Sequence, residues 1–355
     1  MSAYVVHTDL QVLGTGEQFP SLALDTDGLV ARFRDNLGFK SAPLAKRIAK
    51  TMGIQHRRLV RDLKDARETP RDGENNPDLA AQAVQQALAD AGLSADALQY
   101  LIGHTASPHT FIPPNVSWVA DRLNYAGPYG EFRQACTGFA NALVMANGLL
   151  SVNGDAPIAL VGSETGSVFC DLGNLDADRG QFVNAVQMGD GSAAVVLKRG
   201  AGASSQRIEL VFFGQLKTGA TPGFTMAEGA SGAPALERRT LHFDHDFNSV
   251  RNDGPDLFAR GLQTLKDLDI DINQMDWIIP HQANGRIDEV MEDALGIPRE
   301  KVVVDATMTG NLGSAAIWVS FHRLRMSDRI KPGDRVLILG AEATKYMFGG
   351  FIYQH

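Results

Sequence analysis

The sequence predicts an α/β protein built from two similar halves, in which apolar strands alternate with amphipathic helices. Three observations lead to this prediction. The chain has 355 residues, more than a single hydrophobic core usually holds. Hydrophobic residues make up 44% of it and charged residues 21%, as in soluble α/β proteins rather than disordered chains. The order of helix-like and strand-like segments in the first half also returns in the second half.

The first half starts its series with an amphipathic helix at 77–93, followed by the apolar run 97–107. Apolar residues at helical spacing predict the helices, and short apolar runs between turn signals predict buried strands. The remaining segments of this half are, in order, a helix at 115–123, a strand at 130–138, a helix at 140–154 and a strand at 156–164.

The second half repeats that order about half a chain later. Each long final helix is followed by a glycine suited to a helix C-cap, Gly154 in the first half and Gly333 in the second. The corresponding segments are a helix at 255–270, a strand at 275–285, a helix at 285–297, a strand at 302–311, a helix at 314–333 and a strand at 335–343.

Near-continuous apolar strands that alternate with helices are typical of parallel sheets covered on both faces. We therefore expect two domains related by a pseudo-twofold axis, 1–200 and 201–355. The segment 199–206 is predicted to connect them, and 220–234 to form a long loop. Because all α/β proteins alternate their elements, a chance repeat stays an alternative.

Charge and composition narrow the function classes. Lys and Arg total 33 against 41 Asp and Glu, a net charge of -8, so no broad face is expected to bind nucleic acid. No apolar run is long enough for a membrane span, and the first residues lack a secretory leader, which predicts a cytoplasmic protein. The two cysteines, Cys136 and Cys170, argue against a disulfide framework or a cysteine zinc site, so no metal is expected.

Cys136 lies between a predicted strand and a helix that starts near Phe139. In open α/β sheets, functional groups collect where strands end and helices begin. A sulfur facing the positive end of a helix is stabilised as a thiolate, which makes it a nucleophile. A buried structural cysteine is the alternative interpretation, and Cys170 is interpreted as a bystander thiol.

Two further residues occupy comparable boundaries. His281 follows the apolar run WIIP, and Asn311 lies in TGNLGSAA at the place in the second half that Cys136 has in the first. Alone, each is more often a structural histidine or a turn asparagine. Together they would supply a nucleophile and two hydrogen-bond donors toward an oxyanion or enolate. A neutral amide suits charge stabilisation, whereas a carboxylate would favour proton abstraction, so the prediction is acyl transfer or carbon–carbon bond formation on thioesters.

Four segments, QACTGFANAL, PHQANGRI, TGNLGSAA and GDGSAAVVL, resemble those of 3-oxoacyl-[acyl-carrier-protein] synthase III and its relatives in the thiolase superfamily. The resemblance covers most of the chain. It implies a thiolase-like fold in layers αβαβα, and a catalytic triad of Cys136, His281 and Asn311. It also implies an acyltransferase in which a primer thioester acylates the cysteine. A malonyl thioester then loses CO2, and its enolate attacks the acyl-enzyme.

The resemblance implies further site residues and partners. Phe111 matches a phenylalanine that reaches across a homodimer interface, although a core aromatic is the plain alternative. Arg286 matches an arginine of the carrier-protein docking face, with a solvated arginine as its alternative. Ala343 and Thr344 stand where a glycine-rich loop supplies an oxyanion N–H. Substrates would be coenzyme A or acyl-carrier-protein thioesters, with no bound cofactor.

The chain departs from the family around its substrate entrance. Arg47 and Thr51 replace a Trp and an Arg that hold adenine, and Asp293 and Ala294 replace paired docking lysines. The stretch 40–67 is rich in basic residues, which predicts either a solvated face or a relocated phosphopantetheine or carrier site. Three rival functions stay open: a chain-joining condensing enzyme of secondary metabolism, a non-catalytic partner subunit, and a cysteine hydrolase.

Overall fold

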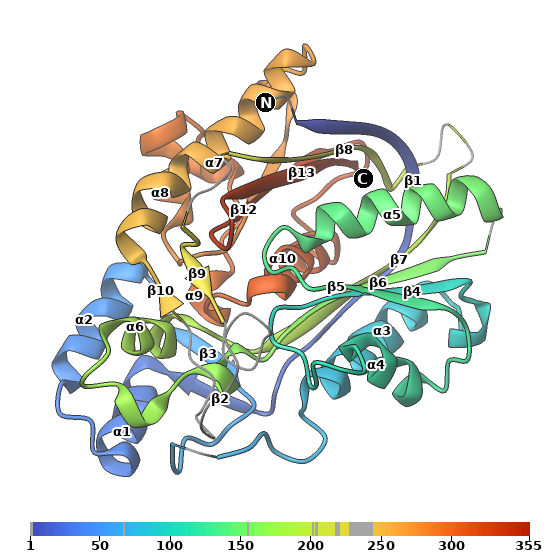
Figure 1. Cartoon of the computed structure of the whole chain (residues 1–355). Coiled ribbons are helices and arrows are strands. Elements are labelled where there is room, and N and C mark those ends of the chain that lie inside the picture. Colours follow the sequence, from blue (N-terminus) through green and yellow to red (C-terminus); the bar gives the residue numbers. More distant parts are fainter. Residues whose placement is uncertain are drawn as a thin grey trace.

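The molecule is organised around a nine-stranded sheet in the order β11-β12-β13-β8-β1-β7-β6-β4-β5 (Figure 1). The computed structural model describes residues 3–66, 68–154, 156–200, 202, 205–216, 221–226 and 244–355. The strands of this sheet are β1 (Tyr4–Gln18), β4 (Tyr100–His104), β5 (Tyr129–Phe132), β6 (Ile158–Glu164), β7 (Gly191–Arg199), β8 (Arg207–Gln215), β11 (Trp277–Pro280), β12 (Arg335–Glu342) and β13 (Met347–Gln354).

The long strand β1 joins the two sides of this sheet. Its residues 10–18 pair with β7, and its residues 4–11 pair with β8. Only the pairs β4 with β5, β4 with β6 and β11 with β12 run parallel. The prediction of parallel sheets is therefore wrong for the middle of the sheet. One reason is local, because a turn of four residues joins β12 to β13, and so short a connection permits only antiparallel pairing.

Helices cover both faces of the sheet and fill the space between its two sides. The buried helices α5 (Gly138–Asn153) and α10 (Ala316–Arg325) pack between the strands of the two sides. α3 (Asn76–Asp90) and α4 (Asn115–Leu123) cover one outer surface, and α7 (Phe247–Asp267) with α8 (Ile287–Leu295) covers the other (Figure 1). The predicted layers αβαβα are confirmed.

The sequence explains why α5 and α10 are central. α5 is apolar on nearly all sides, and in α10 the first six residues, 316–321, are all buried, as expected of segments that lie between two layers of strands. Phe139 of α5 contacts Trp318 of α10 edge to face, with ring centroids 6.2 Å apart, and both contact Phe351 of β13. This aromatic cluster holds the starts of the two helices in one core.

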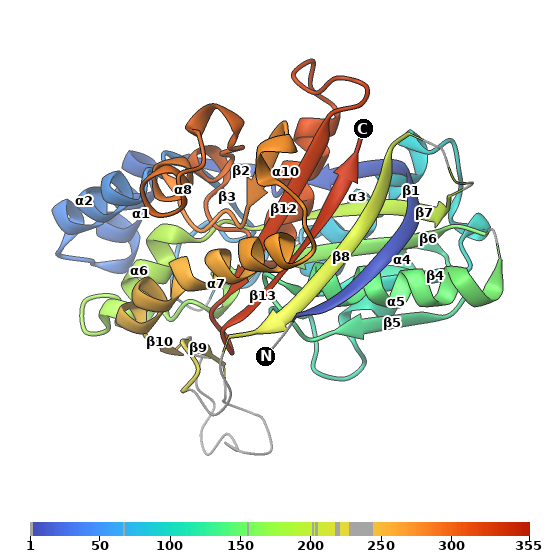
Figure 2. The same ribbon diagram turned by 90° about the horizontal axis from the view of Figure 1, so that it is seen from above.

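A smaller group of elements, here called the cap, lies at one end of the molecule, away from β4, β5 and α4 (Figure 2). It has its own hydrophobic core, which Phe33, Phe39 and Phe182 help to form. Its elements are β2 (Leu22–Asp25), α1 (Thr26–Leu37), α2 (Ala42–Met52), β3 (His56–Leu59), the short helices η2 (Gly166–Phe169) and η3 (Leu172–Asn174), and α6 (Arg179–Gln187).

Several predicted elements differ in detail. The segment 302–311 is not a strand: it makes two isolated bridges, of Val302 with Ile278 and of Asn311 with Met188, and forms the short helix α9 (Ala306–Thr309) between them. β5 is shorter than its predicted strand. Of the predicted loop 220–234, residues 221–226 are described and the rest lies outside the described residues, as does Arg67. None of the helices in the described part of the chain is both long and apolar enough to cross a membrane.

The remaining elements are short. They are η1 (Ala95–Ala97), β9 (Phe224–Thr225), β10 (Asp244–His245), η4 (Ile272–Gln274), η5 (Arg299–Lys301) and η6 (Gly313–Ala315).

Candidate active site

Cys136 lies where the sequence predicts it, between β5 and the start of α5. The side chain is half-buried, Thr137 is the N-cap residue, and the helix begins at Gly138. Gly138 is needed there, because a Cβ at this position would come within 2.7 Å of the ring of His104 from β4. The glycine lets the helix start pack directly on the neighbouring strand.

The expectation of a stabilised thiolate is wrong for the protein without substrate. Burial raises the pKa of the Cys136 thiol well above its usual value, and the nearby charges of Glu342 and Glu164 raise it further. The helix start therefore does not overcome the cost of burying a negative sulfur beside two carboxylates. Cys136 must lose its proton to a base when it attacks.

His281 follows β11 and is held through its backbone. Its N–H donates to the carbonyl of Leu339 at 2.7 Å, and its carbonyl accepts from Ala283 at 2.9 Å. The residue is 5% exposed, and burial lowers its pKa to about 4, so the ring is neutral at physiological pH. Its Nδ1 has no hydrogen-bond partner among the described residues. A neutral imidazole can donate a hydrogen bond, which is the role predicted for His281, and it can also accept a proton.

Asn311 lies between α9 and η6, and its backbone is tied to α6. Its N–H donates to Gln187 at 3.0 Å, and its carbonyl accepts from Gly189 at 3.1 Å. The side-chain oxygen accepts the N–H of Gly313 at 2.9 Å. Because the amide oxygen is already used, the NH₂ group is the end of this side chain that can donate to a substrate oxygen.

Side-chain hydrogen bonds connect the three segments that carry these residues. Gln187, which holds the backbone of Asn311, also donates its amide to Ala283, two residues after His281, at 2.8 Å. The hydroxyl of Ser314 donates mainly to Glu164 at 2.8 Å, and it also lies 3.3 Å from the carbonyl oxygen of Gln134, two residues before Cys136. The structure thus brings the three predicted segments together, although they are far apart in the sequence.

The other predicted site residues have different surroundings. Phe111 is 61% exposed, so the alternative of a core aromatic is wrong. Arg286 is exposed and forms an ion pair with Glu289 at 3.3 Å. Thr344 lies in the turn after β12, and its hydroxyl donates to the carboxylate of Glu342.

The sequence reasoning missed two buried glutamates next to Cys136. Glu164 ends β6 and Glu342 ends β12, and each is 2% exposed. The signal was present in the repeat itself, since VGSE (161–164) and LGAE (339–342) end the two strands that correspond between the halves. Burying a carboxylate costs free energy unless it has hydrogen-bond or charged partners. Both glutamates are therefore candidates for a functional role.

A surface groove of about 630 Å³ lies beside the segment that follows His281. Its lining includes Lys46 and Lys50 of α2, together with Gly285, Arg286 and Thr307. Thr307 precedes Asn311 by four residues, so the groove borders both segments that carry the second-half site residues. Acidic side chains also line it, and one of them, Asp27, pairs with Lys46 at 2.7 Å.

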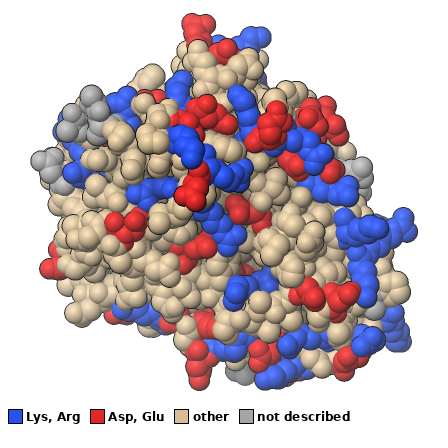
Figure 3. All heavy atoms as spheres, turned by 180° about the vertical axis from the view of Figure 1, so that it is seen from behind, with Lys and Arg blue, Asp and Glu red and all other residues tan. Residues whose placement is uncertain are grey.

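The basic stretch 40–67 divides into two groups. Arg57 and Arg61 are buried in the cap, where Arg57 donates to the carbonyl of Val186 at 3.1 Å, so these two serve the fold. Only the exposed basic residues of this stretch can form a charged surface. They are Lys40, Lys46, Arg47, Lys50, Arg58 and Lys64. On the face seen in Figure 3, basic and acidic side chains are interspersed.

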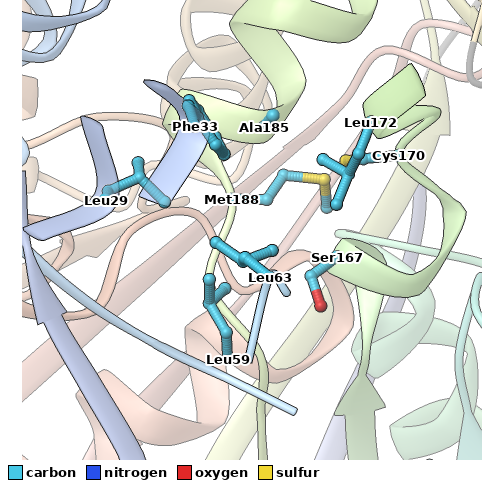
Figure 4. A pocket seen from close by; sticks show the side chains of 9 residues that line it. All are labelled: Leu29, Phe33, Leu59, Leu63, Ser167, Cys170, Leu172, Ala185 and Met188. Carbon is cyan, nitrogen blue, oxygen red and sulfur yellow. The ribbon is translucent and has the colours of Figure 1, made fainter. Parts of the chain in front are cut away.

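Cys170 lies apart from this arrangement. It lines a small apolar cavity of the cap, of about 10 Å³, together with residues such as Phe33 and Met188 (Figure 4). Burial raises the pKa of its thiol to about 12. A neutral sulfur among aliphatic side chains is the environment of a structural cysteine. Within the described ranges, no group of three or more His, Cys, Asp or Glu side chains is placed to hold a metal ion.

Comparison with known families and proteins gives a consistent result. Residues 131–214 match the model of 3-oxoacyl-[acyl-carrier-protein] synthase III, and residues 265–353 match the model of its C-terminal part. The chain is 29% identical to the beta-ketoacyl-[acyl-carrier-protein] synthase III of Paramagnetospirillum magneticum, over 97% of this chain and 96% of that protein. It is also 29% identical to the enzyme of that name from Neisseria gonorrhoeae, over 93% of this chain and 94% of that protein.

Solved structures agree in fold. The tetronic acid condensing enzyme AbyA1 has a TM-score of 0.83 and 27% identity, over 98% of this chain and all of that one. The 3-oxoacyl-(acyl carrier protein) synthase III of Pseudomonas aeruginosa has a TM-score of 0.78 and 24% identity, over 98% of both chains. The matched segments carry both Cys136 and Asn311, and over nearly its whole length the chain is similar to the beta-ketoacyl-[acyl-carrier-protein] synthases III.

Proposed function

We propose that this protein is a condensing acyltransferase that joins an acyl thioester to a malonyl thioester with loss of CO2. The observation that carries the proposal is the set of hydrogen bonds that joins the segments of Cys136, His281 and Asn311. These links between segments support a centre at the ends of strands in which a half-buried thiol, a neutral imidazole and an oriented amide act together. These groups suffice for acyl transfer followed by attack of an enolate.

In the first step, Cys136 attacks the primer thioester and loses its proton to His281, whose neutral ring can accept it. The acyl group passes to sulfur, and the primer's thiol leaves with that proton. In the second step, the amide of Asn311 and the imidazole of His281 donate to the oxygen of the malonyl thioester while CO2 departs. The enolate carbon then attacks the acyl group, the bond to Cys136 breaks, and the thiolate that leaves takes up a proton from water to restore the thiol.

The groove beside Arg286 is the proposed entrance for a phosphopantetheine arm, which is carried either by coenzyme A or by a carrier protein. Its two lysines, Lys46 and Lys50, suit a phosphate or an acidic carrier. Because the adenine-holding residues of the family are replaced by Arg47 and Thr51, the groove favours recognition of the arm and its phosphate over recognition of the adenine.

A homodimer is part of this proposal. β5 is an edge strand of the nine-stranded sheet, and an open edge readily pairs with a second copy. Nearby, the neighbouring residues Phe111 and Ile112 are 61% and 89% exposed, and Tyr129 of β5 is 43% exposed. Apolar side chains beside an open strand support an interface in which Phe111 reaches the partner's site.

One specific observation favours the alternative of a chain-joining condensing enzyme. Glu164 and Glu342 lie close enough to Cys136 to raise its pKa, and carboxylates beside the nucleophile favour proton abstraction. Such a base could activate a second acyl thioester that does not lose CO2. The likeness to a tetronic acid condensing enzyme also supports this alternative.

One experiment separates these functions. Wild-type protein is incubated with acetyl-, butyryl- or octanoyl-CoA, and the mass added to the peptide of Cys136 is measured; malonyl-carrier protein is then added. An adduct followed by CO2 release and a 3-oxoacyl product supports the proposal. Product without CO2 supports chain joining, release of free acid supports a hydrolase, and an unmodified Cys136 with all three donors overturns the proposal in favour of a partner subunit.

A further inference from the structure

The two buried glutamates make equivalent contacts across the two halves of the chain. Glu342, from the second half, accepts both the backbone N–H and the hydroxyl of Thr137 on Oε2, at 2.9 and 2.7 Å. Glu164, from the first half, accepts both the backbone N–H and the hydroxyl of Ser314 on Oε2, at 3.0 and 2.8 Å. Each carboxylate therefore binds one N–H and one O–H of a single residue in the opposite half.

The second oxygen of each carboxylate also accepts a hydroxyl, this time from a residue of the same half. Oε1 of Glu342 accepts the hydroxyl of Thr344, and Oε1 of Glu164 accepts the hydroxyl of Ser107. No lysine, arginine or histidine of the described ranges forms an ion pair with either carboxylate. Hydrogen bonds are thus the main compensation that each buried carboxylate receives.

A glycine two residues before each glutamate allows the close approach. A Cβ at Gly340 would come within 2.6 Å of the ring of Phe139, just after Thr137. A Cβ at Gly162 would come within 2.4 Å of the carbonyl of Ser314. The Gly-x-Glu ends of β12 and β6 therefore fit against the helix starts as matching parts, which makes a chance arrangement of the two carboxylates implausible.

The residues held in this way adjoin the proposed reactive side chains. Thr137 follows Cys136 directly, and Ser314 follows Asn311 by three residues. We propose that Glu342 and Glu164 are paired positioning residues, and that each fixes, from the opposite half, the segment that carries one reactive group. Glu342 would set the place of the nucleophile Cys136, and Glu164 that of the amide donor Asn311. This inference rests on the proposed function.

The proposal assigns the two glutamates to different steps. Loss of the Glu342 contacts releases the segment of Cys136, so formation of the acyl-enzyme slows. Loss of the Glu164 contacts releases the segment of Asn311, so consumption of the acyl-enzyme slows. A misplacement of about 1 Å can cost on the order of 10²-fold in rate. We expect losses of that order, each confined mainly to one step.

The test compares Glu342→Ala, Glu164→Ala and a matched control. Acylation is followed by mass spectrometry with octanoyl-CoA, and discharge of the preformed octanoyl-enzyme is followed with malonyl-carrier protein and, separately, with a second portion of octanoyl-CoA. The control is Asp271→Ala, because Asp271 also accepts the N–H at a helix start, that of Asn273 at 2.9 Å in η4, before β11 and thus at the opposite end of that strand from His281. It should slow neither step more than about twofold.

The glutamines keep the proposal testable where the alanine variants do not fold. In Glu342→Gln, the amide oxygen can still accept from Thr137, and its NH₂ can donate to the hydroxyl of Thr344 once that hydroxyl turns. Glu164→Gln has the same options with Ser314 and Ser107. Both glutamine variants should therefore retain each step within a few-fold, whereas Glu342→Asp, which is one methylene too short, should resemble the alanine variant.

The rate at which iodoacetamide alkylates Cys136 is a further measurement. A purely structural role of the two glutamates would leave this rate unchanged. The titratable groups on the elements around the start of α5 are His104 of β4, Glu164 of β6, Glu342 of β12, and His281 after β11. Since negative charge raises the pKa of the thiol, Glu342→Gln should lower it and speed alkylation several-fold at pH 8. Glu164→Gln should act in the same direction, and Asp271→Asn should have no effect.

Equal losses in both steps for both alanine variants, unchanged rates in both, or an unchanged alkylation profile in both glutamine variants would overturn the inference. Failure of the proposed function is a different result, because wild-type protein itself would then form no acyl adduct on Cys136 with octanoyl-CoA.

Discussion

The centre of the molecule and its cap differ in how closely they follow the family. At the centre, the segments of Cys136, His281 and Asn311 carry family motifs and are joined by direct hydrogen bonds. In the cap, Arg47 and Thr51 replace family residues, and the charges around the groove are partly neutralised by acidic neighbours. Under the proposed function, this difference means that the chemistry depends on the meeting of the two halves, whereas substrate choice depends on the cap.

Of the changes that test this comparison, replacing the nucleophile should have the largest effect on activity. Cys136→Ala should lower product formation by about 10⁴-fold or more and abolish the acyl adduct, because no other described side chain at the centre offers a nucleophilic sulfur. Mass spectrometry after exposure to octanoyl-CoA measures the adduct. Cys170→Ala, in the cap, serves as the control and should keep both adduct and activity; loss of the adduct in that variant instead would contradict the assignment.

Removing a hydrogen-bond donor at the centre should have the next largest effect on activity. Asn311→Ala deletes one of two hydrogen bonds to the developing enolate oxygen, and such a deletion costs about 10²–10³-fold. Single-turnover measurements should show slow discharge of the acyl-enzyme with near-normal acylation. Asn273→Ala changes an exposed asparagine whose side chain donates to Asp271 at 2.9 Å, far along the chain from the reactive residues, and it should leave both steps unchanged. A loss confined to acylation would speak against the enolate role.

Acid should destabilise the centre through its buried histidines. Burial lowers the pKa of His104 to about 3 and that of His281 to about 4, against 6.5 in the unfolded chain. Both histidines stay neutral in the folded protein, so only the unfolded state gains protons as the pH falls below 6.5. Stability should therefore decline from pH 6.5 toward pH 4, by on the order of 3 kcal/mol for each histidine.

Urea unfolding at pH 7 and pH 4.5 measures this decline. His104→Gln can still accept the indole N–H of Trp318, which bonds to His104 at 2.9 Å in the wild type, and it should reduce the loss on acidification. The comparison is sharpened by His56→Gln in the cap, where the side chain borders the solvent-filled groove. An equal reduction in both variants would show that burial at the centre is not the cause.

Charge changes around the groove, which is lined by α2 of the cap and by the segment after His281, should have the smallest effect. Lys50→Glu or Arg286→Glu should raise KM for a carrier-bound substrate about three- to tenfold and leave kcat nearly unchanged, because these side chains lie at the groove and not at the reacting atoms. The increase should shrink at high salt. Lys331→Glu, exposed on a distant turn, is the control. A fall in kcat without a change in KM would place the groove residues in the chemical step.

Much of the fold and of the site could be predicted from the sequence. The helix at 115–123 has the predicted bounds, and the final strand of each half ends within one residue of the predicted position. These elements have a clear apolar period, which local sequence alone encodes. The segment 302–311 was predicted as a strand because it is apolar, but only Val302 finds a strand partner, and the chain then turns into α9.

The site likewise combines features that the sequence predicts with features that only the folded structure reveals. The types and order of Cys136, His281 and Asn311 determined the chemistry, because their motifs lie at strand and helix boundaries that sequence patterns reveal. Only the tertiary structure decided the state of the thiol, since burial and the charges of Glu164 and Glu342 come from residues about 30 and 200 positions away. Burial and electrostatics depend on which segments meet in space, and that is a property of packing that no local pattern contains.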